Sequence, residues 1–418
     1  MSFATGYLAS QAIRERLIGP PPDPGCGMIV AIPAFNEPGL IRCLESLQNC
    51  SAPPVGVEVH VFFNAPAEAD GNMLEQNRES QLQMQDWCRR NVSSPYRFFS
   101  YLENLSDEKS GGVGLARKIL MDEAVRRFDQ IGRPEGIILS LDADTLVSRD
   151  YLQAVYRHFT AEKNTDGCSV YFEHPIQGME YPDDIYNAIA SYELHQRYYL
   201  HAVRYTGYPF AFHTVGSAFA VKAVSYVRMG GMNRRQGGED FYFIQKLANT
   251  GRFSECREAS VFPSPRPSDR VPFGTGPAVR RLIQGEEKVL LTPPFSSFRR
   301  LRDLFVSLSA SGDGGEISSD PLVSGFLDSV AFREKIAEIR SNTASEKSFN
   351  KRFFQWFDML MILRFLHYLR DQGIADRPVQ GESISLLEQV GYKVEQDTGI
   401  QDLLGIFRKI DREGLICR

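Results

Sequence analysis

Two aspartates, Asp142 and Asp144, stand one residue apart at the end of the apolar run Gly136–Leu141. Carboxylate oxygens are the ligands that Mg²⁺ and Mn²⁺ prefer, and these ions commonly share their coordination sphere with substrate phosphates. The pair could therefore offer one oxygen to a metal ion and another to a sugar hydroxyl. The alternative is a plain strand end followed by a turn, where aspartate is common.

A second acidic pair, Glu239 and Asp240, follows two glycines in the stretch GGEDFYFIQKL. This stretch has helical spacing, so the pair lies at the start of an expected helix. A carboxylate in that position could serve as a general base that takes a proton from a reacting hydroxyl. It could also do no more than cap the helix, because acidic side chains are favoured near a helix N-terminus.

These acidic residues need a framework, and the first 150 residues predict one. Short apolar runs alternate with helical patterns, which is the order of a doubly wound, mostly parallel α/β sheet flanked by helices. The strands are expected at 27–35, 55–64, 96–102 and 136–141, and the helices at 40–47, 70–92 and 114–128. Ligands of such sheets bind at the carboxyl ends of the strands, so Asp142 and Asp144 are expected on the ligand side.

The chain beyond Asp150 is less regular. Strands are expected at 168–175 and 216–223, and the helix that begins with the second acidic pair is expected to end at Gly251. The residues from about 276 onward have mostly helical patterns. The expected domains are an N-terminal arm at 1–25, an α/β domain at 26–275 and a mostly helical C-terminal region at 276–418.

Composition narrows the classes of function. The formal net charge of −5 argues against a general nucleic-acid-binding protein, which needs a positive surface. The 7 cysteines are an odd number without C-x-x-C spacing, which predicts neither a disulfide framework nor a zinc site and favours a cytoplasmic protein. The N-terminal stretch lacks the apolar core of a signal peptide. The most apolar stretch, Trp356–Leu369, is too short to span a membrane and carries charges, so we expect no transmembrane segment. Peripheral membrane contact and a homo-oligomer stay open.

Several motifs of the chain together resemble those of one enzyme family. MIVAIPAFNE is similar to the opening strand of the family 2 glycosyltransferases, SLDADT to their D-x-D motif and GGEDFYF to their E-D pair. KSGGVGLARK resembles the segment that precedes the D-x-D strand, and VGSAFAVKAVSYVRMGGMN resembles the strand and turn before the E-D pair. The resemblance covers about residues 27–255, and it implies the GT-A fold.

The resemblance implies an inverting glycosyltransferase that moves a sugar from a nucleotide-diphosphate sugar to an acceptor hydroxyl. A divalent metal ion, Mn²⁺ or Mg²⁺, would stabilise the departing diphosphate, with Asp144 as its first ligand and Asp142 as its second. Asp240 would be the general base, and Glu239 would hold sugar hydroxyls. The residues implied at the nucleotide sugar are Pro33, Phe35, Asn36, Glu37, Asn64, Lys109, Gly111, Arg117, Asp142 and Ala143. Gly216 and Ser217 are expected at the acceptor or the donor sugar.

One position departs from the family pattern. After the second strand the family usually has an aspartate that accepts a hydrogen bond from the base, whereas this chain has Asn64, whose amide oxygen can still accept one. A UDP-sugar is favoured over a GDP-sugar as donor, and the acceptor is not identified. The segment 263–276, which contains Arg266 and Arg270, is expected to be either a mobile lid over the diphosphate or a linker.

Other readings of the same residues stay open. A sugar nucleotidyltransferase should carry a glycine-rich loop after the first strand, where this chain has IPAFNEPG. A degenerate module that binds a nucleotide sugar without turnover would not need both acidic pairs. Several GT-A enzymes complete their metal site with a downstream histidine, but only His367 follows Asp240. His174 and His213 come earlier, and we interpret them as structural.

Overall fold

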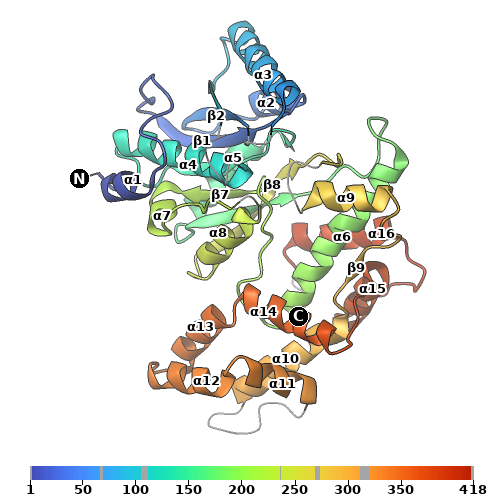
Figure 1. Cartoon of the computed structure of the whole chain (residues 1–418). Helices are drawn as coiled ribbons and strands as arrows, with labels where there is room; N and C mark the ends of the chain where they lie inside the picture. Colours follow the sequence, from blue (N-terminus) through green and yellow to red (C-terminus); the bar gives the residue numbers. More distant parts are fainter. Residues whose placement is uncertain are drawn as a thin grey trace. The chain divides into compact units, whose positions relative to one another are not determined.

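The computed structural model describes residues 2–65, 69–104, 112–235, 237–268, 274–310 and 320–415. The chain forms two compact units. Unit 1 comprises Met1–Met179 and Phe212–Ala278, and unit 2 comprises Glu180–Ala211 and Val279–Arg418. Unit 1 holds the sheet, and unit 2 is mostly helical (Figure 1).

Unit 1 is built on an 8-stranded mixed sheet with the order β3-β2-β1-β4-β7-β6-β8-β5. The strands are β1 (Cys26–Ala34), β2 (Gly56–Ala65), β3 (Arg97–Asn104), β4 (Ile137–Ser140), β5 (Leu146–Val147), β6 (Gly167–Phe172), β7 (Phe219–Lys222) and β8 (Phe253–Phe262). β3, β2, β1 and β4 run parallel, as does the pair of β6 and β8, whereas β7 is antiparallel to both of its neighbours and β5 is antiparallel to β8. The predicted α/β fold is therefore confirmed, with antiparallel pairings in its second half.

Burial explains why β1 is a central strand. All 9 of its residues are buried, which is the pattern of a strand covered on both faces. β1 pairs in parallel register with β2 and β4, with Ile32 opposite Val61 and Ala31 opposite Ser140. The three strands therefore run to the same edge of the sheet, where Glu37 follows β1, Asn64 is the last residue but one of β2, and Asp142 follows β4. The ligand side expected from the sequence is this edge.

Helices cover the sheet of unit 1 on both faces. They include α1 (Thr5–Gln11), α2 (Leu40–Gln48), α3 (Gly71–Arg90), α4 (Val113–Gln130), α5 (Tyr151–Ala161), α7 (Ala223–Arg228) and α8 (Glu239–Ala248). α4 packs against β1 and is buried along most of its length, and its buried residues include the charged Arg117, Lys118, Asp122, Glu123 and Arg127. Buried charges require partners, so α4 is a helix around which polar contacts gather. The sequence patterns did not predict α5.

Unit 2 consists mainly of helices, which confirms the predicted helical C-terminal region. They include α6 (Asp183–Tyr205), α10 (Phe295–Ala310), α11 (Pro321–Ser329), α12 (Phe332–Ser341), α13 (Glu346–Trp356), α14 (Met359–Asp371), α15 (Val379–Gln389) and α16 (Ile400–Glu413). α9 (Thr275–Ile283) spans the division between the units, and β9 (Leu291–Thr292) pairs with β10 (Arg377–Pro378). Within the described ranges, no helix combines the length and the apolar character needed to cross a membrane.

α6 packs against α16 inside unit 2 (Figure 1). Ion pairs join the two helices. Arg197 donates a hydrogen bond to Glu193 (Nε to Oε1, 2.9 Å) and forms an ion pair with Asp411. Arg408 contacts the other oxygen of Glu193 at 2.7 Å, and His201 Nε2 lies 2.8 Å from Asp411 Oδ1. Because these charges are buried and mutually paired, losing one partner would leave the others uncompensated.

The two units do not follow the expected domain limits at 26–275 and 276–418, because α6 groups with the C-terminal helices. The sequence patterns also did not predict α6. The assignment of these ranges as domains stays a prediction.

Candidate active site

The second acidic pair lies at the start of α8, as its sequence pattern predicts. Gly238 precedes the helix with φ 69°, a left-handed conformation that glycine adopts without strain. Glu239 is 3% exposed, whereas Asp240 is half-buried and its Oδ1 accepts a hydrogen bond from the Phe241 N–H at 2.7 Å. At this turn the Glu239 side chain is therefore buried, whereas the Asp240 side chain stays partly accessible to solvent.

Arg117 of α4 connects this acidic pair to the first aspartate of the D-x-D motif. Its Nη2 donates to Asp142 Oδ1 at 2.8 Å, and its Nε lies 3.4 Å from Glu239 Oε1. Its Nη1 donates to Ser140 Oγ at 3.2 Å and to the backbone oxygen of Gly216 at 3.3 Å. Arg117 is 2% exposed, so one buried guanidinium gathers residues from β4, α8 and the loop before β7.

Gly216 is where the backbone approaches both Arg117 and Asp240. A Cβ atom at this position would lie 2.9 Å from Arg117 Nη2 and 3.0 Å from Asp240 Oδ2. These distances are too short for any side chain to be added without moving one of the two groups. The structure therefore brings the expected Gly216 to the acidic pair and shows why glycine suits this position.

The environment changes the acidity of the pair. Burial and the neighbouring charge of Glu239 raise the pKa of Asp240 to about 7, although Arg117 lowers it. Burial also raises the pKa of Glu239, again against the effect of Arg117. A carboxylate whose pKa lies near neutrality is suited to exchanging a proton with a reacting hydroxyl at physiological pH.

The ends of β1 and β2 are joined by a residue that the sequence did not single out, Asn77 of α3. Asn36 follows β1 in a left-handed conformation, φ 48°, and its N–H donates to Asn77 Oδ1 at 2.8 Å. Asn77 Nδ2 in turn donates to the backbone oxygen of Asn64 at 2.7 Å. One signal could have found Asn77: the buried face of α3 combines it and Ser80 with Met84 and Trp87.

Glu37 is occupied by contacts within unit 1. Its Oε1 accepts from the Gly39 N–H at 2.8 Å, and its Oε2 lies 2.5 Å from Nη2 of Arg266. Glu37 is 3% exposed. The ion pair fixes the segment after β8 to the end of β1, so Arg266 lies near the carboxyl end of that strand.

Asp142 and Asp144 leave β4 in a turn, in which the Thr145 N–H donates to the Asp142 backbone oxygen at 3.1 Å. Both side chains are half-buried. Burial and then the charges of Asp144, Asp142 and Glu37 raise the pKa of the Cys43 thiol. In the part of the chain that the structure describes, no cluster of three or more His, Cys, Asp or Glu side chains forms a metal site by itself.

The other residues expected at the site differ in burial and in whether the structure describes them. Pro33, Ala143 and Ser217 are buried and Phe35 is half-buried, with Pro33 opposite Phe62 in the sheet. Lys109, Gly111 and Arg270 lie outside the described residues. His174 and His213 both present their rings edge-on to Phe172, with centroids at 5.8 and 5.0 Å.

A model of a known protein family matches the central part of the chain. Residues 137–281, about a third of the chain, match the family model described as Glycosyl transferase family group 2. The expected resemblance and the expectation of a glycosyltransferase are thereby confirmed. The matched segment includes the D-x-D motif, Gly216 and the acidic pair of α8.

Solved structures show a looser likeness. TarS 1-349 from S. aureus in complex with UDP-GlcNAc is 15% identical, with 93% of this chain and 92% of that chain covered and a TM-score of 0.39. The mannosyltransferase PcManGT from Pyrobaculum calidifontis in complex with GDP-Man and Mn2+ is also 15% identical, with 98% and 92% covered and a TM-score of 0.37. At such TM-scores no property of these enzymes is transferred to this chain. No curated protein matches the chain in sequence.

Proposed function

We propose that the chain is an inverting glycosyltransferase that moves a sugar from a nucleotide-diphosphate sugar to an acceptor hydroxyl, with Asp240 as the general base. The observation that carries this proposal is the position of Arg117 between Asp142 and Glu239. Two acidic motifs that lie far apart in the sequence are thereby held in one site. Helix capping alone would not require a buried arginine that also binds the D-x-D motif.

The donor would bind at the edge where β1, β2 and β4 end. Asn36 and Asn64 stand there at a fixed spacing, because Asn77 holds the backbone of both. Fixed backbone groups at this edge suit the base and the ribose of a nucleotide. The acceptor capacity of the Asn64 amide supports a UDP-sugar as the first donor to test.

The turn after β4 suits a divalent metal ion. Its donors are the carboxylates of Asp142 and Asp144, and Mg²⁺ is typically held by one or two carboxylates together with substrate phosphates. When bound, such an ion would supply Lewis-acid stabilisation of the negative charge on the departing diphosphate. Asp144 would hold it, and Asp142 would share it while its Oδ1 accepts from Arg117.

Asp240 would take the proton of the acceptor hydroxyl. It is half-buried, and its pKa of about 7 leaves it mostly ionised just above neutral pH while keeping it basic enough to accept a proton. Glu239, which pairs with Arg117, would hold the guanidinium at a fixed position relative to Asp240. Direct attack assisted by one base inverts the configuration at the anomeric carbon, because the acceptor approaches opposite the leaving diphosphate.

The test combines binding and turnover. Thermal unfolding would be followed with UDP or GDP, each in Mn²⁺, Mg²⁺ or EDTA, for the wild type, Asp144→Asn and Asp240→Asn. Binding at a hundredfold excess over the dissociation constant stabilises a protein by about 2.7 kcal/mol. We expect metal-dependent stabilisation by one nucleotide in the wild type and in Asp240→Asn, and its loss in Asp144→Asn. Asp150→Asn is the matched control, because this aspartate lies on the same segment and bonds to Ser148 instead (2.8 Å).

Turnover of the stabilising nucleotide's sugar donors would then be measured. We expect release of the nucleotide diphosphate by the wild type and a loss of a hundredfold or more, on the order of the general-base contribution, in Asp240→Asn. Binding without any turnover would contradict the proposal and favour a degenerate binding module. Stabilisation by neither nucleotide would contradict the donor site itself.

A further inference from the structure

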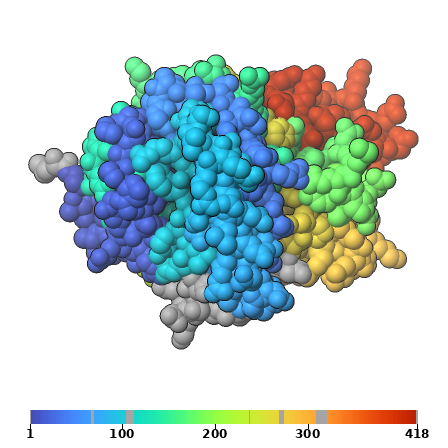
Figure 2. Space-filling model, turned by 90° about the horizontal axis from the view of Figure 1, so that it is seen from above, coloured from blue at the N-terminus to red at the C-terminus, as the bar shows by residue number. Residues whose placement is uncertain are grey.

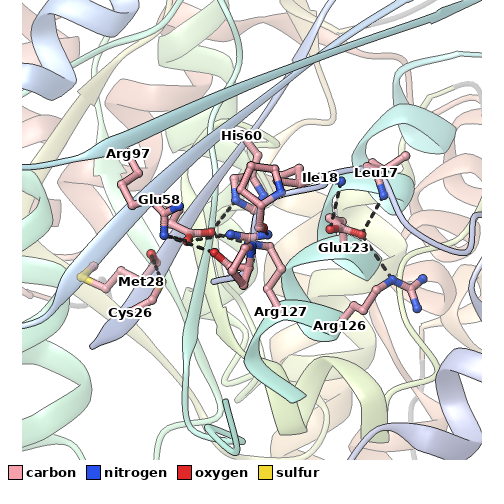
Figure 3. Close-up of polar contacts among 12 residues, drawn as sticks. Leu17, Ile18, Cys26, Met28, Glu58, His60, Arg97, Glu123, Arg126 and Arg127 are labelled. Carbon is pink, nitrogen blue, oxygen red and sulfur yellow. Dashed lines mark hydrogen bonds and ion pairs between the residues drawn. The ribbon is translucent and has the colours of Figure 1, made fainter. Parts of the chain in front are cut away.

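The N-terminal arm, residues 2–25, lies along α4 and is fixed to it by charged side chains (Figure 3). Glu123 accepts from the backbone N–H groups of Leu17 at 3.2 Å and Ile18 at 3.4 Å. Arg127, which is also paired with Glu58, donates to the backbone oxygen of Pro20 at 2.9 Å. Figure 2 shows dark-blue atoms from the N-terminal part of the chain beside cyan atoms from a later segment of unit 1. The arm thus supplies partners for buried charges of α4.

One residue of the arm reaches further, into the contact between α4 and α7. The Tyr7 hydroxyl donates to Asp122 Oδ1 at 2.7 Å and accepts from Lys118 Nζ at 3.0 Å. The Tyr226 hydroxyl of α7 donates to the same Asp122 oxygen at 3.0 Å, and the two tyrosine rings meet edge to face at 5.9 Å. All four side chains are buried, so α1, α4 and α7 (Figure 1) are tied together at Asp122.

The Tyr7 hydroxyl also lies directly against Gly231. Gly231 has φ 72°, and a Cβ atom built on it would overlap the hydroxyl oxygen and lie 3.2 Å from Lys118 Nζ. The Gly231 N–H donates to the backbone oxygen of Tyr226 at 3.0 Å. Gly231 begins the segment 231–238, of which the structure describes every residue but 236, and Glu239 and Asp240 follow it in the sequence. The Tyr7 hydroxyl therefore limits how far Gly231, the first residue of this segment, can move toward α4.

α4 holds the other end of the same segment. A Cβ atom on Gly114 would overlap the backbone oxygen of Arg235 and lie 3.1 Å from Cβ of Glu239. One turn along α4, Arg117 pairs with Glu239. The helix that fixes Tyr7 through Lys118 and Asp122 is thus the helix against which the acidic pair is placed. A displacement of Gly231 would move the segment relative to α4.

We propose that Tyr7 is a positioning residue for the general base: its hydroxyl, held by Asp122 and Lys118, fixes Gly231 at the start of the segment and hence the place of Asp240. This inference rests on the proposed function. It makes the arm part of the machinery of turnover although the arm contributes no group to the reaction. Misplacing a catalytic group by about 1 Å can reduce a rate a hundredfold, so loss of this contact should be seen in kcat.

The test compares Tyr7→Phe with a matched variant of the full chain. Tyr96→Phe removes another buried hydroxyl, which donates to the backbone oxygen of Cys50 at 2.9 Å. We expect kcat to fall between about tenfold and a hundredfold in Tyr7→Phe only. The KM of the donor and the nucleotide-induced thermal shift should stay at the wild-type values in both variants.

Hydrogen exchange of the backbone amides in 231–238 gives a second readout that does not need turnover. We expect faster exchange there in Tyr7→Phe than in Tyr96→Phe. Gly231→Ala approaches the same contact from the other side and should lower kcat in a folded protein even if Tyr7→Phe unfolds.

The results separate this inference from the proposed function. Wild-type kcat and wild-type exchange in Tyr7→Phe would overturn the positioning role while leaving the glycosyltransferase standing. An equal loss of kcat in Tyr96→Phe would also overturn it, because the effect would then follow the loss of any buried hydroxyl and not the contact with Gly231. A wild type without turnover whose segment 231–238 still loosens in Tyr7→Phe would refute the proposed function and support the positioning.

Discussion

The pH dependence of turnover tests the role of Asp240 directly. Burial and the charge of Glu239 raise its pKa from 3.8 to about 7, while Arg117 lowers it. A general base works only when it is ionised, so kcat should rise with pH, reach half of its plateau near pH 7 and level off about one pH unit higher. Each pH unit below the pKa reduces the ionised fraction about tenfold. The rate should therefore be about a tenth of the plateau at pH 6 and about a hundredth at pH 5.

Two substitutions should move the acid limb, the part of the pH profile in which kcat rises with pH, in opposite directions. Glu239→Gln keeps the size of the side chain but removes a charge that raises the pKa of Asp240, so the limb should shift to lower pH. Arg117→Gln removes a charge that lowers this pKa, so its limb should shift to higher pH. The assay is the initial rate of donor turnover between pH 5 and 9 at constant ionic strength, with each variant normalised to its own plateau.

Specific outcomes would refute the reasoning. A limb that stays in place or moves upward in Glu239→Gln would mean that this charge does not act on the base. A pH-dependent rate that survives in Asp240→Asn at the wild-type level would place the base elsewhere.

The pH dependence of thermal unfolding gives an independent measure of the pKa of the Asp240 carboxyl. Because the folded pKa of Asp240 exceeds the unfolded value, folding favours its protonated form. This contribution is fully present below about pH 4, the unfolded pKa, and is lost as the pH rises through about 7. Asp240→Asn should therefore unfold at a higher temperature than the wild type at pH 8, with a difference that disappears near pH 4.

Three further substitutions test other parts of the molecule. Gly216→Ala should nearly abolish turnover with little change in unfolding temperature, because its Cβ would displace Arg117 and Asp240 and not the core; wild-type kcat would contradict this geometry. Asn77→Asp can still accept from the Asn36 N–H but cannot donate to Asn64, so the KM of the donor should rise on the order of tenfold, about one hydrogen bond, at unchanged kcat. Asp411→Ala should destabilise unit 2 by about 3–5 kcal/mol in urea unfolding, because buried charges lose their partner.

The acidic motifs could be found from the sequence because each stands where a strong local pattern changes. Asp142 ends an apolar strand, and Glu239 follows two glycines at the start of an amphipathic helix. The contacts that make them one site could not be found in this way. Arg117 meets Asp142 across 25 positions, and Asn77 meets Asn36 across 41 positions, so both depend on how the elements pack.

α6 shows a different reason for failure. Its buried face contains Glu193, Arg197 and His201, so the apolar spacing that reveals most helices is interrupted by charges. Those charges are tolerated because α16 supplies Arg408 and Asp411. A local pattern cannot anticipate partners more than 200 positions away.

The pairing of α6 with α16 also has a consequence for how the protein is made. Arg197 and Asp411 are 214 positions apart, so on the ribosome α6 emerges long before its partner exists. Domains generally fold as the chain is synthesised, but unit 2 cannot close until α16 has left the exit tunnel. Until then α6 exposes charges and apolar side chains that belong in an interior. Unit 2 should therefore be the late and chaperone-dependent part of biogenesis, and a stalled chain that lacks α16 should be the species that proteases and holdases recognise.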